Sequence, residues 1–110
     1  MRVPEIVDQL DWTVLAGSDH LDVDVQGGYV ADLLSCVMAG AETGDLWITL
    51  QTHANIVAVA SLLGVAAIVV AEGAVVPEAT LAKAEQQGMA VLSTKNPVYE
   101  TVAQLIPLGI

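Results

Sequence analysis

The pattern of hydrophobic and polar residues predicts a strand, a helix and a second strand in the middle of the chain. Residues 46–50 form a short apolar run with an aromatic and two β-branched residues, which is typical of a strand covered on both faces. Residues 53–63 are apolar on nearly every side, so we expect a helix packed on more than one side, ended by Gly64. Residues 66–70 repeat the buried-strand pattern. Two such strands joined by a helix indicate a parallel sheet with a right-handed crossover.

The residues before this unit predict two helices, a strand and an alternating segment. Apolar residues at helical spacing predict an amphipathic helix over residues 3–10, and residues 12–16 read as a strand. Residues 18–25 alternate polar and apolar side chains, as on an edge or hairpin segment. A break at Gly27-Gly28 then precedes a helix. Its expected apolar stripe is Val30, Leu33, Leu34, Val37 and Met38.

After the central unit we expect a helix from Pro77 to about Gln87, a strand over residues 89–92 and a final helix that starts at Pro97. The fold class is therefore α/β: a three-layer α/β/α domain with a mostly parallel four-stranded sheet plus a short edge or hairpin segment. No linker or repeat interrupts the pattern, so residues 1–110 are expected to form a single domain.

Hydrophobic residues make up 55% of the 110 residues, and the mean hydropathy is +0.64. Only 4% of residues are aromatic, so the core is built from aliphatic side chains. This apolar content exceeds what one small core needs, which predicts a homodimer. The helix over residues 53–63 and the C-terminal helix are the expected contact surfaces.

The net charge of -10 comes from thirteen acidic residues against Arg2, Lys83 and Lys95. So few cations exclude nucleic acid and anionic membranes as partners. The single Cys36 forms no intramolecular disulfide and fits a cytoplasmic protein, and no signal peptide is visible. Residues 54–71 are uncharged and long enough to span a bilayer, but a break at Gly64 and flanking acids favour a buried core.

Polar residues follow the predicted strands, where α/β proteins bind ligands. Thr52 stands where an N-cap residue belongs, so the helix start after it is a candidate anion site, with Lys95 adding a positive charge. The residues predicted to bind a ligand are Gly27, Gly28, Thr52, His53, Asn55, Ser93, Thr94 and Lys95. The alternative is structural: Thr52 merely caps a helix, His53 packs beside it, and Gly27-Gly28 is a tight turn.

Metal binding and nucleophilic catalysis are two further kinds of chemistry to consider in this sequence. His20, Asp22 and Asp24, with Asp19, lie on one side of an extended segment and are reasonable metal ligands, although such charges are more often the solvated face of an edge strand. Cys36 and the serines lack a nucleophile motif. We therefore predict no catalytic residue, no metal and no cofactor. A small metal-dependent hydrolase using His20 is the remote alternative.

Several segments together resemble the DRTGG domain family: residues 24–30, 32–35, 37–39, 44–49, 51–60 and 92–95. Asp24, Gly27 and Gly28 match the signature pentapeptide, whereas Val25 and Gln26 replace its Arg and Thr. The resemblance covers nearly the whole chain. Residues 51–60 and 92–95 also resemble the small stand-alone members of the family.

This resemblance implies a regulatory, ligand-sensing module rather than a catalyst. Related domains accompany CBS domains in regulated pyrophosphatases, precede the catalytic domain of some phosphotransacetylases, and are similar in fold to the N-terminal domain of HPr kinase/phosphorylase. The first hypothesis is a non-catalytic module that senses a small phosphorylated metabolite or nucleotide and tunes a partner enzyme or regulatory protein. The alternative is an acidic protein-interaction adaptor without a ligand.

Overall fold

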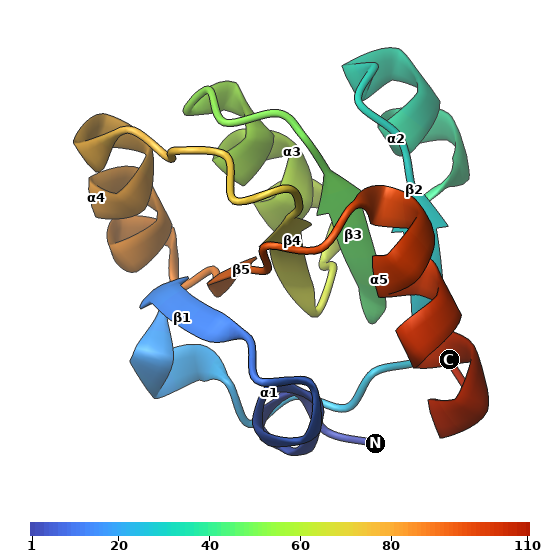
Figure 1. The fold of residues 1–110 in the computed structure, drawn as a ribbon. Coiled ribbons are helices and arrows are strands. Elements are labelled where there is room, and N and C mark those ends of the chain that lie inside the picture. The colour runs from blue at the N-terminus through green and yellow to red at the C-terminus, as the bar shows by residue number, and fades with distance from the viewer.

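A five-stranded sheet forms the middle layer of the domain in the computed structural model, which describes all 110 residues (Figure 1). The strands are β1 (Thr13–Ala16), β2 (Gly27–Val30), β3 (Asp45–Thr49), β4 (Ala67–Val70) and β5 (Val91–Ser93). Their order across the sheet is β1-β5-β4-β3-β2. Strands β2 to β5 are parallel, and β1 runs antiparallel to β5 at one edge.

Five helices cover the two faces of the sheet: α1 (Val3–Leu10), α2 (Leu34–Gly40), α3 (Asn55–Leu63), α4 (Glu78–Gln87) and α5 (Val98–Leu105). Two short 3-10 turns, η1 (Ser18–His20) and η2 (Ile106–Leu108), complete the chain. Helices α2, α3 and α4 connect successive parallel strands and lie together on one face, as right-handed crossovers require. Helices α1 and α5 cover the opposite face.

The two central strands supply both halves of the core. All residues of β3 and β4 are buried, and successive side chains point to opposite faces. Leu46 and Ile48 pack toward α1 and α5, whereas Trp47 packs toward α2, α3 and α4. The prediction of a three-layer α/β/α fold with two fully buried central strands is therefore confirmed.

The segment that follows residue 26 was predicted wrongly. Gly27 and Gly28 do not form a turn but begin β2, and α2 starts only at Leu34. Gly27 lies opposite Asp45, and a Cβ atom at Gly27 would come 3.0 Å from the Asp45 carboxylate. Pairing with β3 thus decides the conformation, against the local preference of a Gly-Gly pair for a turn. The expected apolar stripe is confirmed only in part: Val37 is buried and Leu34 packs against the core, whereas Val30, Leu33 and Met38 are exposed.

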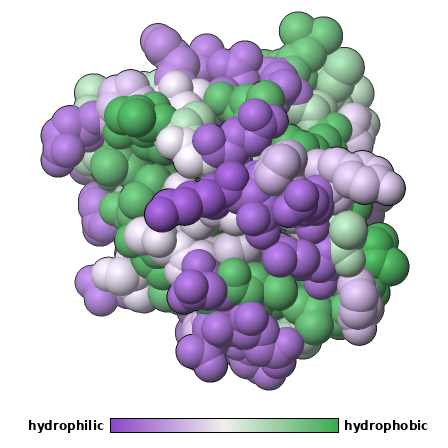
Figure 2. Space-filling model, viewed as in Figure 1, coloured by the Kyte–Doolittle hydropathy of each residue, from purple (hydrophilic) through white to green (hydrophobic).

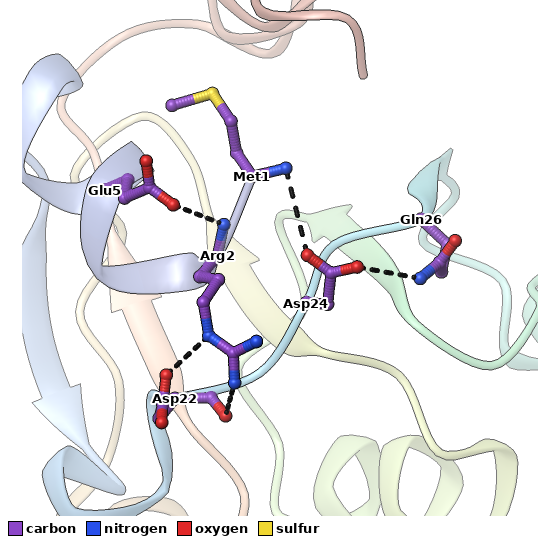
Figure 3. Close-up of polar contacts among 6 residues, drawn as sticks. All are labelled: Met1, Arg2, Glu5, Asp22, Asp24 and Gln26. Carbon is purple, nitrogen blue, oxygen red and sulfur yellow. Dashed lines mark hydrogen bonds and ion pairs between the residues drawn. The ribbon is translucent and has the colours of Figure 1, made fainter.

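Residues 18–25 do not form the expected edge strand, and only Asp24 makes a single antiparallel bridge, with Arg2. Polar contacts tie this segment to the start of α1 (Figure 3). The Arg2 guanidinium donates hydrogen bonds to the carboxylate and carbonyl oxygens of Asp22. The hydrogen bond and charge of Asp22 raise the pKa of Arg2 above its usual value. The carboxylate of Asp24 lies 3.9 Å from the Met1 ammonium and accepts a hydrogen bond from Gln26.

None of the helices has the length and apolar character needed to cross a membrane. The uncharged run over residues 54–71 is divided between α3 and β4, with Gly64 in the left-handed conformation between them.

Candidate functional site

The loops that leave β4 and β5 diverge to opposite faces of the sheet. The loop after β4 leads to α4 on one face, and the loop after β5 leads to α5 on the other (Figure 1). Two backbone hydrogen bonds of 2.9 Å join these loops, from Glu72 N to Asn96 O and from Gly73 N to Thr94 O. In open α/β sheets a crevice forms where adjacent connections diverge in this way, and ligands bind there.

A cleft of about 480 Å³ lies at this point of the sheet. It is bounded by the end of α1, the start of β1 and the two diverging loops, and it is almost entirely polar. Its lining residues are Leu10, Asp11, Thr13, Gly73, Ser93, Thr94, Lys95 and Asn96. Leu10 is the single hydrophobic member of this set. The cleft therefore suits a hydrogen-bonding ligand rather than an apolar one.

The polar groups of the cleft offer both a cation and an anion. Lys95 is exposed and makes no ion pair, because the ion pairs of the chain involve only the cations of Met1 and Arg2. Thr94 is 6% exposed, and its hydroxyl accepts a hydrogen bond of 3.2 Å from Asn96 N. Asp11 supplies a carboxylate from the left-handed residue that ends α1. A ligand with a phosphate and hydroxyl groups matches this combination.

The structure brings together three of the eight residues predicted to bind a ligand. Ser93, Thr94 and Lys95 line the cleft. Thr52, His53 and Asn55 do not line it, because they follow β3, which β4 separates from β5. Two strand spacings place the ends of β3 and β5 about 10 Å apart. Gly27 and Gly28 begin β2 and so lie at the amino edge of the sheet, opposite the cleft.

The corner at Thr52 differs from the prediction in its capping. The N-cap residue of α3 is Ala54, and no side chain caps the helix from that position. His53 Nδ1 instead accepts a hydrogen bond of 3.1 Å from Asn55 N. The Thr52 carbonyl accepts a hydrogen bond of 2.8 Å from the buried Thr80 hydroxyl on α4. The prediction that Thr52 is the N-cap residue is therefore wrong. Its carbonyl instead links the loop before α3 to α4 through this hydrogen bond.

The chain's own side chains fill the neighbouring corner, where β2 and β3 end. One oxygen of Asp32 accepts hydrogen bonds from the Thr49 hydroxyl at 2.9 Å and from Leu50 N at 2.8 Å. The side-chain amide of Gln51 donates a hydrogen bond of 3.1 Å to the backbone carbonyl of Asp32. This carboxylate fixes the loop after β2 to the end of β3, and it is satisfied without a ligand.

A second cleft, of about 330 Å³, lies at the opposite edge of the sheet, and Asp19, His20 and Asp22 are among its lining residues. These side chains do not converge, since no group of three His, Cys, Asp or Glu residues is placed to hold a metal ion. Asp22 binds Arg2, and Asp24 contacts Met1 and Gln26. The geometry therefore gives no support to the alternative of a metal-dependent hydrolase built on His20 and the aspartates.

Sequence reasoning missed Asp11 and Thr13 as members of the cleft. Asp11 and Thr13 come from the first strand and the residues before it, far along the chain from Lys95. They join the cleft because β1 pairs with β5. The signal available in the sequence was the polar run over residues 93–96, which identifies one wall and not its partner.

The DRTGG domain model matches residues 5–107, which is most of the chain. The chain belongs to the DRTGG domain family. No curated protein matches it significantly. In this DRTGG domain, two of the signature positions serve packing: Val25 is 7% exposed within the core, and Gly27 allows the Asp45 carboxylate to approach. The replacement of the signature Arg by Val25 therefore puts an aliphatic side chain into the core.

One solved structure similar to this DRTGG domain is the crystal structure of the CBS and DRTGG domains of the regulatory region of Clostridium perfringens pyrophosphatase, complexed with its activator, diadenosine tetraphosphate. The TM-score is 0.73 at 20% sequence identity. The match covers 96% of this chain and 45% of that one, so the DRTGG domain spans less than half of the regulatory region. The similarity supports the α/β fold described above.

Proposed function

We propose that this DRTGG domain is a non-catalytic regulatory module that binds a small phosphorylated metabolite or a nucleotide in the cleft at the end of β5, beside the start of β1. Lys95 binds the phosphate, and the Ser93 and Thr94 hydroxyls hydrogen bond to it. Occupancy of the cleft then tunes the activity of a partner enzyme. The observation that carries this proposal is the unpaired Lys95 in a polar cleft at the point where the loops after β4 and β5 diverge.

Charge supports this position over other surfaces. Arg2 is bonded to Asp22 at the opposite edge of the sheet, and Lys83 lies on α4 outside the cleft. Lys95 is therefore the cation available to an anionic ligand at the carboxyl edge. In a chain of net charge -10, an anion binds only where a local positive charge outweighs the general repulsion.

The similar regulatory region from Clostridium perfringens supports the class of ligand, since that protein is complexed with diadenosine tetraphosphate. Nucleotides with one or more phosphates are accordingly the first probes to test.

We expect Lys95→Gln to weaken nucleotide binding by about 10- to 100-fold, because a charge-assisted hydrogen bond contributes about 1.5–3 kcal/mol. The measurement is isothermal titration calorimetry with AMP, ATP and diadenosine tetraphosphate. Lys83→Gln is the matched control, since it makes the same charge change outside the cleft and should leave affinity unchanged. A ligand present at about a hundred times its dissociation constant should also stabilise the native protein by about 2.7 kcal/mol.

Three results would contradict the proposal. Equal losses in the two lysine variants would mean that binding responds to net charge and not to the cleft. Loss in a Thr52→Val, His53→Ala double variant, with Lys95→Gln unaffected, would place the ligand at the start of α3. Absence of binding to every phosphorylated probe would favour the ligand-free adaptor.

Removing the negative charge of the cleft should act in the opposite direction. We expect Asp11→Asn to tighten the binding of pyrophosphate by about two- to fivefold, because an unfavourable interaction of about 0.5–1 kcal/mol between like charges is removed. Asparagine tolerates the left-handed backbone of this position, where φ is 57°, so the fold is retained. Asp8→Asn, on α1, is the control for net charge. Chemical-shift titration measures both affinities, and weaker binding by Asp11→Asn would show that its carboxylate contacts the ligand.

A further inference from the structure

The outer edge of β2 is open. Strand β2 is the last strand in the sheet order and pairs only with β3. Its residues, Gly27–Val30, include no proline and no charged residue, the two kinds of residue that protect sheet edges from pairing. The opposite edge strand, β1, is different: its register shifts between Val14 and Ala16, an irregularity that discourages further pairing. Of the two edges, β2 is the one prepared to accept another strand.

Exposed apolar side chains gather around this edge. Five of the nine large hydrophobic residues that are exposed come from the segments beside β2: Val30, Leu33, Met38, Leu50 and Ile106. The C-terminal residues also lie there, since Ile110 is 4.0 Å from the position that a Cβ atom of Gly28 would take. Figure 2 shows hydrophobic surface over α2 and beside the end of α5. We call residues 27–40, which include β2 and α2, and residues 101–110 the β2 face.

The β2 face is nearly free of charge in a strongly acidic chain. Thirteen acidic residues are distributed over 110 positions, yet residues 25–41 contain only Asp32 and residues 101–110 contain none. The Asp32 carboxylate is turned into the corner with Thr49 and Leu50. No lysine, arginine or histidine lies in either segment. Acidic side chains are thus sparser in these two segments than in the rest of the chain.

We propose that the β2 face binds a second copy of this chain, with the two β2 strands paired antiparallel about a twofold axis so that the sheets join into one of ten strands. Two copies, each with a charge of -10, repel each other wherever acidic surfaces meet, and contact through the uncharged face keeps those charges apart. Antiparallel pairing of identical strands is self-complementary, as a twofold interface requires. A basic partner would instead be drawn to the acidic surface.

This interface differs from the surfaces expected from the sequence. Helix α3 was one candidate, but it packs against both α2 and α4, and Ile56, Val57 and Ala60 are buried within the domain. The C-terminal helix, the other candidate, contributes through its last turn and η2. The proposed dimer is independent of the polar cleft. That cleft lies at the end of β5 beside the start of β1, at the other side of the sheet.

The test is the mass of the full chain in solution by light scattering coupled to size exclusion, without ligand. We expect the wild type to have twice the monomer mass of 11.4 kDa at a protein concentration of about 100 µM. A Leu33→Glu, Met38→Glu variant should be monomeric. The control is Leu62→Glu, Val75→Glu, which adds the same charge at residues that are 72% and 87% exposed outside the β2 face and should remain dimeric. Circular dichroism establishes that each variant is folded.

Two further readouts identify the mode of contact. Raising the salt concentration should strengthen the dimer, because screening reduces the repulsion between acidic copies, whereas an interface held by ion pairs would weaken. Amide hydrogen exchange at Gly28 and Val30 should slow as protein concentration rises, because these amides point away from β3 and strand pairing at the edge would protect them. A monomeric wild type, a dimer that survives Leu33→Glu, Met38→Glu, or exchange in β2 that ignores concentration would overturn the proposal. None of these outcomes depends on nucleotide binding.

Discussion

Replacing Gly17 with alanine is expected to destabilise the domain by about 3 kcal/mol. Gly17 lies between β1 and η1 with φ at 75°, a conformation that costs an L-residue about 1–2 kcal/mol. Its added Cβ would also lie 2.5 Å from the Met89 carbonyl oxygen and 2.7 Å from Ala90 Cα. Both contacts are with the backbone before β5, which has no free rotamer to adopt, so overpacking adds a further cost of about 1–3 kcal/mol.

Movement of the Gly17 backbone could relieve this strain only by breaking a hydrogen bond. Gly17 N donates a hydrogen bond of 2.7 Å to the carboxylate of Glu85 on α4, and a shift would break it. Gly109→Ala is the matched control: φ is 86° there, but nothing lies within 4 Å of the added Cβ. We expect the control to lose about 1 kcal/mol. Urea unfolding measures both, and equal losses would mean that the close approach to residues 89 and 90 is relaxed in solution.

Replacing Trp47 with alanine is expected to cost about 4 kcal/mol, within the range for removal of a large buried aromatic side chain. Trp47 is completely buried on β3 between the sheet and the layer of α2, α3 and α4. Its indole N–H donates a hydrogen bond of 2.9 Å to the Ala31 carbonyl, just after β2. The substitution therefore leaves a cavity and also releases the end of the edge strand.

Trp47→Phe separates these two effects. Phenylalanine keeps most of the buried ring but not the donor, so we expect a loss of about 1–2 kcal/mol. Thermal unfolding by calorimetry provides the comparison for both variants. If Trp47→Phe were as damaging as Trp47→Ala, the hydrogen bond to Ala31 and not the packing of the ring would be the main contribution of this residue.

The layers of this fold were predictable because its buried strands have a strong sequence pattern. The continuous apolar runs in β3 and β4 identify a sheet covered on both faces, and the helices α1, α3, α4 and α5 begin and end close to the expected positions. These elements are specified locally, by periodicity and by residues such as Gly64 and Gly88 that end helices in the left-handed conformation.

Strand β2 was not predictable in the same way. Gly27-Gly28 is a turn signal by local preference, and Tyr29 and Val30 are too few to mark a strand. The strand exists because Gly27 and Gly28 allow the backbone to pair with β3 beside Asp45. Such pairing is a property of the folded chain, and no short window of sequence contains it.

Predicting the cleft required the strand order, which cannot be deduced from the sequence pattern. Placing Lys95 at the carboxyl edge required only that β5 be parallel to its neighbours. Choosing between Thr52 and Asp11 as its companions required the order β1-β5-β4-β3, in which β4 separates the Thr52 corner from β5 and β1 adjoins it. Three of the eight residues expected to bind a ligand line the cleft, and the other five lie at other strand ends.

The two backbone hydrogen bonds between the loops after β4 and β5 have a consequence for how a ligand is received. Glu72 and Gly73 are held against Asn96 and Thr94 by the folded chain itself. The entropy of ordering these loops is thus lost during folding, and a ligand need not supply it. The cleft is preorganised, so the proposed ligand would bind with little backbone rearrangement and would act through the shape and charge that it adds rather than by folding a disordered segment.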